Sequence, residues 1–71
     1  MNADKARAAG VAFARKLAEK VHVINPASHV HIASCRCIHA APLTLFQKLA
    51  CQKAFKKAAA EEFHRLTGVQ I

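Results

Sequence analysis

Alanine is by far the most frequent apolar residue of this sequence, and that limits what the chain can fold into. Sixteen of the 71 residues are alanine, against nineteen large apolar residues, and tryptophan and tyrosine are absent. Alanine supports helix strongly but buries little area, so the hydrophobic fraction of 54% overstates the core. We therefore predict one small, mainly helical domain over residues 1–71. Its thin core makes self-association, a metal or a partner a source of added stability.

The first third of the chain has the periodicity of an amphipathic helix over about residues 3–24. The apolar face consists of Ala6, Gly10, Phe13, Leu17, Val21 and Ile24. Asn2 is suited to cap the helix, and the pair Asn25-Pro26 is expected to stop it because a residue before proline leaves helical geometry. Glycine destabilises a helix relative to alanine, so Gly10 on the apolar face indicates close approach of another backbone.

A second long helix is predicted over about residues 43–67. Thr44-x-x-Gln47 has the form of a capping box, while Pro42 alternatively fits a first helical position. Gly68 is placed to end the helix in the left-handed conformation. Apolar residues lie on two sides of this helix. Leu45, Phe46 and Leu49 occupy one side, whereas the other carries Cys51, Phe55, Ala59 and Leu66.

Two apolar sides require either a bend near Ala50 or two halves that pack on different elements. The second option fits an assembly, in which a partner chain covers one half. Exposed clusters of large apolar residues usually mark interfaces. We therefore predict a homodimer or a hetero-complex with Leu45, Phe46 and Leu49 near the centre of its interface.

The segment between these helices is rich in histidine and cysteine. Alternation at His29–Ile32 and Cys35–His39 favours extended structure. A helical reading also survives, with Ser28 as N-cap and one face made of Val30, Ala33, Cys37 and Ala41. The predicted fold is thus two long helices flanking a short extended segment, and the alternative is a three-helix domain.

An extended segment would place five potential metal ligands on one face, because side chains alternate with period two. They are His29, His31, Cys35, Cys37 and His39. Imidazole and thiolate are ligands that suit Zn²⁺. The spacing differs from the usual structural-zinc patterns, and histidine and cysteine also occur as ordinary half-buried residues. We therefore expect no cofactor and ordinary half-buried roles for these residues, with zinc as the alternative.

The charge balance favours an acidic partner. Eleven Lys and Arg against four Asp and Glu give a net charge of +7, which suits nucleic acid, a ribonucleoprotein, an acidic protein surface or an anionic membrane. The candidate contact residues are Arg15, Lys16, Lys48, Lys53, Lys56 and Lys57. The sequence carries none of the usual motifs that read nucleic-acid sequence. All four phenylalanines occur where core is expected, so we predict contacts to phosphates rather than bases.

Catalysis is not expected from this sequence. His22 and His39 are possible bases, but nucleophile-elbow and P-loop motifs are missing, and Glu61 and Glu62 fall on a helical turn that we expect to be exposed. The odd cysteine count and the lack of a recognisable targeting segment favour a cytoplasmic protein with reduced thiols.

We predict a non-enzymatic binding protein that contacts nucleic acid or a ribonucleoprotein through Lys and Arg. One alternative is a small inhibitor or adaptor of the kind that phages and other mobile elements encode, which blocks one protein. Another is a metal-stabilised regulatory module.

Overall fold

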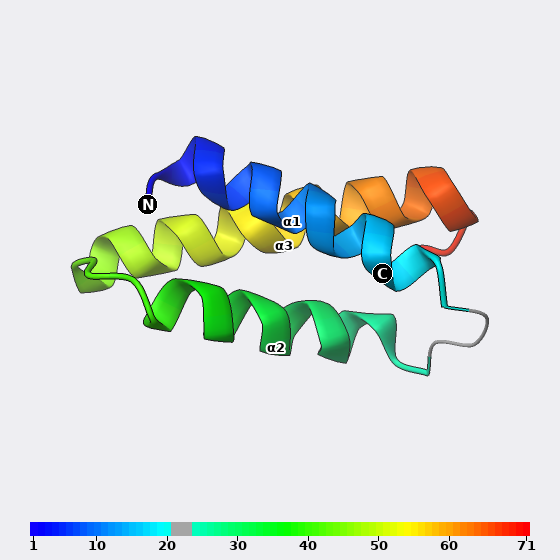
Figure 1. Cartoon of the computed structure of the whole chain (residues 1–71), viewed down its shortest axis with the longest axis horizontal. Coiled ribbons are helices and arrows are strands. Elements are labelled where there is room, and N and C mark those ends of the chain that lie inside the picture. Colours follow the sequence, from blue (N-terminus) through cyan, green and yellow to red (C-terminus); the bar gives the residue numbers. More distant parts are fainter. Residues whose placement is uncertain (21–23) are drawn as a thin grey trace.

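Three helices make up the described part of the chain, residues 1–20 and 24–71 of this computed structural model. They are α1 (Ala3–Ala18), α2 (Pro26–His39) and α3 (Leu45–Thr67). In Figure 1, α1 and α3 point the same way along the long axis of the molecule, and α2 runs in the opposite direction. Within the described residues there are helices and no strands, so the three-helix alternative is confirmed.

Each helix buries a row of residues spaced four apart, which therefore lie on one side of the helix. The rows are Ala6, Gly10 and Ala14 in α1; Val30, Ser34 and Ile38 in α2; and Cys51, Phe55 and Ala59 in α3. The row of α1 is made of small residues, and α1 has its most extensive contacts with α3. Ser34 is polar but satisfied, because its hydroxyl donates a hydrogen bond to the carbonyl oxygen of His31 at 2.7 Å.

Gly10 lies at a close contact between α1 and α3. A Cβ atom at this position would overlap the carbonyl oxygen of Phe55 and would lie 3.2 Å from both the carbonyl carbon and the Cα of that residue. These are backbone atoms, which cannot rotate away as a flexible side chain would. The close approach predicted from Gly10 is thus confirmed, and its partner is the backbone of α3.

The predicted helix caps are also confirmed. The side chain of Asn2 accepts a hydrogen bond from the backbone nitrogen of Lys5 at 2.9 Å. Thr44 and Gln47 form both bonds of the capping box, at 3.2 Å and 2.9 Å. Gly68 has φ 76°, and its backbone nitrogen donates to the carbonyl oxygen of His64 at 2.7 Å.

The first helix is shorter than predicted. It ends at Ala18, and Ile24, which we placed on its apolar face, lies outside any helix and is exposed. The pair Asn25-Pro26, which we expected to stop the first helix, begins α2. Asn25 adopts a left-handed conformation with φ 54°, and Pro26 takes the first position of α2, where a missing N–H costs no helical hydrogen bond. The predictions for Val21 and His22 lie outside the described residues.

The prediction of extended structure between the long helices is wrong, because the segment from Pro26 to His39 is helical. A lone strand leaves its backbone groups without a partner, whereas a helix satisfies them within the segment. The alternation that favoured a strand also contains the row of Val30, Ser34 and Ile38, which suits a helix equally. Of the face proposed for the helical reading, Val30 is buried, and Ala33 and Cys37 pack partly buried against the core. The N-cap is Asn25 rather than Ser28.

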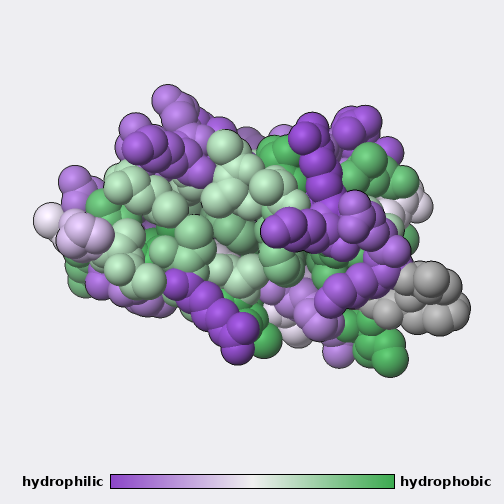
Figure 2. All heavy atoms as spheres, viewed as in Figure 1, coloured by the Kyte–Doolittle hydropathy of each residue, from purple (hydrophilic) through white to green (hydrophobic). Residues whose placement is uncertain are grey.

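The surface in front of α1 is weakly hydrophobic. Figure 2 shows pale green residues over the left and centre of this face, with hydrophilic side chains above and below them and across part of the right half. Ala8 and Ala12 are among the exposed residues of α1. Within residues 1–20 and 24–71, none of the helices has both the length and the apolar character needed to cross a membrane.

Candidate nucleic-acid interface

Three lysines gather on the outer side of α3. Lys53 and Lys57 are each two residues from the buried Phe55, which places them about 160° away from it around the helix. Both are exposed, and Lys56 beside them is half-buried. We call Lys53, Lys56 and Lys57 the lysine ridge. The clustering predicted for these three residues agrees with their helical positions and exposure.

The lysine ridge separates two shallow grooves. Lys53 and Lys57 line a groove between α1 and α3 together with Arg7. All three lysines line a second groove, between α2 and α3, together with His31. Arg7 and His31 were not among the predicted contact residues. They reach the ridge only because α1 and α2 pack on α3. For Arg7 the sequence did hold one local signal of this packing, since Gly10 follows it by almost one helical turn and indicates a close approach of α1 to another backbone.

Lysines and arginines have different roles in this molecule. Among the described residues, ion pairs join Arg7 to Asp4, and Arg15 and Arg65 to Glu62. The lysines that the structure describes, by contrast, form no ion pairs within residues 1–20 and 24–71. Three of the four arginines thus contribute to internal ion pairs, while the ammonium groups of the ridge are available to an external anion.

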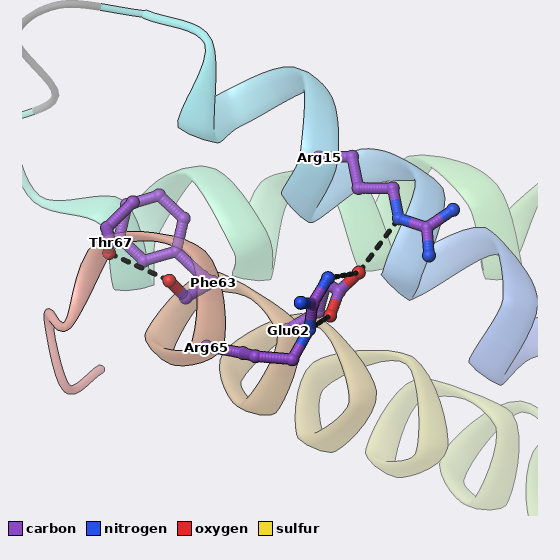
Figure 3. Close-up of polar contacts among 5 residues, drawn as sticks. All are labelled: Arg15, Glu62, Phe63, Arg65 and Thr67. Atoms are coloured by element: carbon purple, nitrogen blue, oxygen red, sulfur yellow. Dashed lines mark hydrogen bonds and ion pairs between the residues drawn. The ribbon is translucent and has the colours of Figure 1, made fainter.

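Glu62 holds α1 against α3 (Figure 3). It accepts hydrogen bonds from Nε of Arg15 at 2.8 Å and from Nε and Nη2 of Arg65 at 2.6 Å and 3.1 Å. These bonds, first those from Arg65 and then the one from Arg15, lower the pKa of Glu62 from 4.5 to about 2. The prediction that Glu62 is exposed is therefore wrong, whereas Glu61 is exposed as expected.

The remaining candidate contact residues are dispersed. Arg15 was predicted to contact the partner, but its Nε–H is used by Glu62. Lys16 is exposed on α1, and Lys48 is half-buried near the start of α3. Neither lysine lines the two grooves beside the ridge. The three ridge lysines are thus the compact part of the predicted set.

The apolar cluster at the start of α3 is exposed. Leu45 is 71% exposed, Phe46 86% and Leu49 57%. The expectation that all four phenylalanines belong to the core is wrong for Phe46. Phe55 and Phe63 are buried, and Phe13 packs on Phe55 with ring centroids 6.1 Å apart. One aromatic ring is therefore available on the surface, on the same helix as the lysine ridge.

The five predicted zinc ligands do not share a face, because the segment that carries them is helical. His31 and Cys35 are one turn apart, with Nε2 and Sγ separated by 3.7 Å, and the side-chain nitrogen of Gln52 donates to the same Sγ at 2.9 Å. His29 and Cys37 line a different groove, beside Phe13. Among residues 1–20 and 24–71, no three His, Cys, Asp or Glu side chains are grouped to hold a metal ion. The geometric basis of the zinc prediction is thus lost.

Among the described residues, the charged ones brought together at the ridge are mostly cations, with Glu61 as the one acidic residue lining the groove towards α1, and one exposed aromatic ring lies on the same helix. Such an arrangement is suited to binding anions, since amines at a surface neutralise phosphate or carboxylate charges. Comparisons of this chain with models of protein families, with curated proteins and with solved structures gave no match.

Proposed function

We propose that this protein is a non-enzymatic nucleic-acid-binding protein whose lysine ridge contacts backbone phosphates. The observation that carries the proposal is the grouping of Lys53, Lys56 and Lys57 on the outer side of α3, with no acidic side chain of the described residues paired to them. Arg7 and His31 extend the polar lining on either side of the ridge.

The physical basis is the release of counterions. A lysine that neutralises a phosphate frees a condensed cation, which gives affinity without sequence preference. Lysine suits this role because its ammonium is a compact charge on a flexible stem. Lys16 and Lys48 remain predicted contacts outside the ridge, where a longer nucleic acid would reach them.

The proposal is tested by comparing two variants that lose the same charge. One replaces Lys53, Lys56 and Lys57 by Gln; the other replaces Lys5, Lys20 and Arg36 by Gln. Binding of a fluorescent oligonucleotide at about 0.1 M salt should weaken about a hundredfold in the first variant, if each lost phosphate contact costs about fivefold. The second variant should bind much more like the wild type, because none of its substitutions lies on α3. Lys5 is in α1, Lys20 follows α1, and Arg36 is in α2.

Equal losses in the two variants would mean that net charge alone attracts the nucleic acid, and would overturn a site on α3. No binding by the wild type at low salt would overturn the proposed function altogether. Circular dichroism should show equal helix content in all three proteins, so that a loss of binding is not a loss of folding.

A second candidate function is binding to one protein partner through Leu45, Phe46 and Leu49. The observation that favours it is the exposure of all three side chains, each more than half accessible. Burying such side chains stabilises a complex by about 1.5–3 kcal/mol each. If the partner is a second copy, light scattering should give the mass of two chains for the wild type and of one chain for Leu49→Glu. A monomeric wild type at high concentration would contradict self-association.

A further inference from the structure

We propose that the nucleic acid bound by this protein is single-stranded, and that Phe46 stacks on one of its unpaired bases. This inference depends on the proposed phosphate contacts of the lysine ridge and adds the form of nucleic acid that is recognised. It uses an aromatic ring that the core leaves exposed and that the fold itself does not require.

Phe46 lies on the same side of α3 as Lys53 and Lys57 of the lysine ridge. Lys53 and Lys57 follow Phe46 by seven and eleven residues, close to two and three full turns, so all three lie within about 20° of one line along the helix. The rise of the helix places the two lysines about 10 Å and 16 Å beyond Phe46. A nucleic-acid strand lying along α3 would therefore meet first the ring of Phe46 and then the ammonium groups of Lys53 and Lys57.

The ring of Phe46 is suited to stacking because it is 86% exposed and Leu45 and Leu49, which neighbour it on α3, are also exposed. Proteins that bind single strands combine a positively charged path for the backbone with aromatic rings on which bases stack. Every base has a π face, so this recognition tolerates all sequences. That tolerance agrees with the absence of base-reading motifs from the sequence.

A duplex does not use this arrangement. Its bases already stack on one another, and their faces open to a protein ring only after unpairing or extrusion. A surface ring beside a basic path thus gains interaction energy only from unpaired bases. The ridge lysines alone would bind both forms, because duplexes and single strands both carry phosphates.

A second copy of the chain fits this face less well. Leu45, Phe46 and Leu49 offer on the order of a few hundred Å² of apolar surface, whereas a stable interface buries about 800 Å² on each partner. Two chains with a net charge of +7 each would also approach through a face that carries exposed lysines. A polyanion removes that repulsion.

The first measurement uses Phe46→Trp. The chain has no tryptophan or tyrosine, so the new indole is the sole strong fluorophore and replaces one stacking ring by another. A single-stranded oligonucleotide of about 15 nucleotides should quench its emission on binding, and a duplex of the same sequence should bind with little quenching. Equal quenching by the two forms, or binding of the single strand without quenching, would overturn the stacking role of Phe46.

The second measurement compares Phe46→Leu with Leu49→Ala. Phe46→Leu keeps an apolar side chain but removes the ring, so affinity for the single strand should fall by roughly tenfold while affinity for the duplex stays unchanged. Leu49→Ala removes apolar surface without touching the ring and should change both affinities little. Lys53→Gln with Lys56→Gln and Lys57→Gln should weaken both forms.

The outcomes separate this inference from the proposed function. If the wild type binds both forms equally and Phe46→Leu behaves like the wild type, the ridge contacts phosphates but Phe46 does not stack. If neither form binds at about 50 mM salt, the proposed function fails and this inference fails with it. A wild type with the mass of two chains that becomes a monomer on Phe46→Leu would assign the ring to a protein interface and overturn the inference.

Discussion

Two residues, Gly10 and Glu62, determine how closely α1 packs on α3. Gly10 permits contact with the backbone of Phe55 because it has no Cβ. Glu62, about two turns beyond Phe55 along α3, receives hydrogen bonds from Arg15 of α1 and from Arg65 of its own helix. The importance of Gly10 was visible in the sequence as a helix-breaking residue on an apolar face. That of Glu62 was not, because only the packed helices show that Arg15 reaches it.

Gly10→Ala should destabilise the protein. Alanine is favoured over glycine in a helix interior by about 1 kcal/mol, but overpacking a close contact costs about 1–3 kcal/mol, and here the obstacle is backbone. Thermal unfolding should show a lower melting temperature for Gly10→Ala. Ala12→Gly, at an exposed position of the same helix, measures the difference in helix propensity between alanine and glycine without a change in packing. A higher melting temperature for Gly10→Ala would contradict the close contact of α1 with α3.

Stability should fall in acid through Glu62. The pKa of this carboxyl is about 2 in the folded protein, against 4.5 ordinarily, because Arg65 and Arg15 hydrogen-bond its charged form. The unfolded chain therefore binds the proton more readily, and the stabilisation is fully present above about pH 4.5 and is lost as the pH falls towards 2. In Glu62→Gln the melting temperature should depend less on pH between these values than it does in the wild type. This variant should also melt several degrees lower at neutral pH. Glu61→Gln, at an exposed neighbouring position, should keep the acid dependence.

At the scale of the helices, sequence patterns predicted α3 well, α1 in part and α2 poorly. Caps are local, so Asn2, Thr44 and Gly68 could be recognised from neighbouring residues. The end of α1 could not, because apolar spacing continues past Ala18 to Ile24. The state of residues 26–39 depends on whether a partner strand exists, and a short histidine- and cysteine-rich segment does not carry that information.

Removal of the cap at the start of α3 should weaken the fold. Thr44→Ala deletes the hydroxyl that accepts from the backbone nitrogen of Gln47 at 3.2 Å, which typically costs about 1 kcal/mol. For a domain of this size the melting temperature should fall by about 4–8 °C. Thr44→Ser retains the hydroxyl and should melt close to the wild type. Equal melting of the serine and alanine variants would show that the capping box contributes little.

At the scale of the whole molecule, three of the four arginines form ion pairs within residues 1–20 and 24–71, whereas the lysines of the same residues form none. Lys53, Lys56 and Lys57 could be predicted as a cluster because all three belong to one helix. Arg7 and His31 could not be added, since they reach the ridge only through the packing of α1 and α2. Phe46 was predicted both with the core phenylalanines and in an interface cluster with Leu45 and Leu49. Its exposure agrees with the second prediction, and periodicity alone does not tell which of two apolar sides a thin core will cover.

The salt dependence of binding tests the lysine ridge most directly. The observed association constant for a single-stranded oligonucleotide should fall linearly on a logarithmic plot against salt concentration. Each phosphate contact contributes a slope of about −0.7, so replacing Lys53, Lys56 and Lys57 by Gln should make the slope shallower by about 2. An unchanged slope in this variant, or an affinity of the wild type that does not respond to salt, would contradict phosphate binding by the ridge.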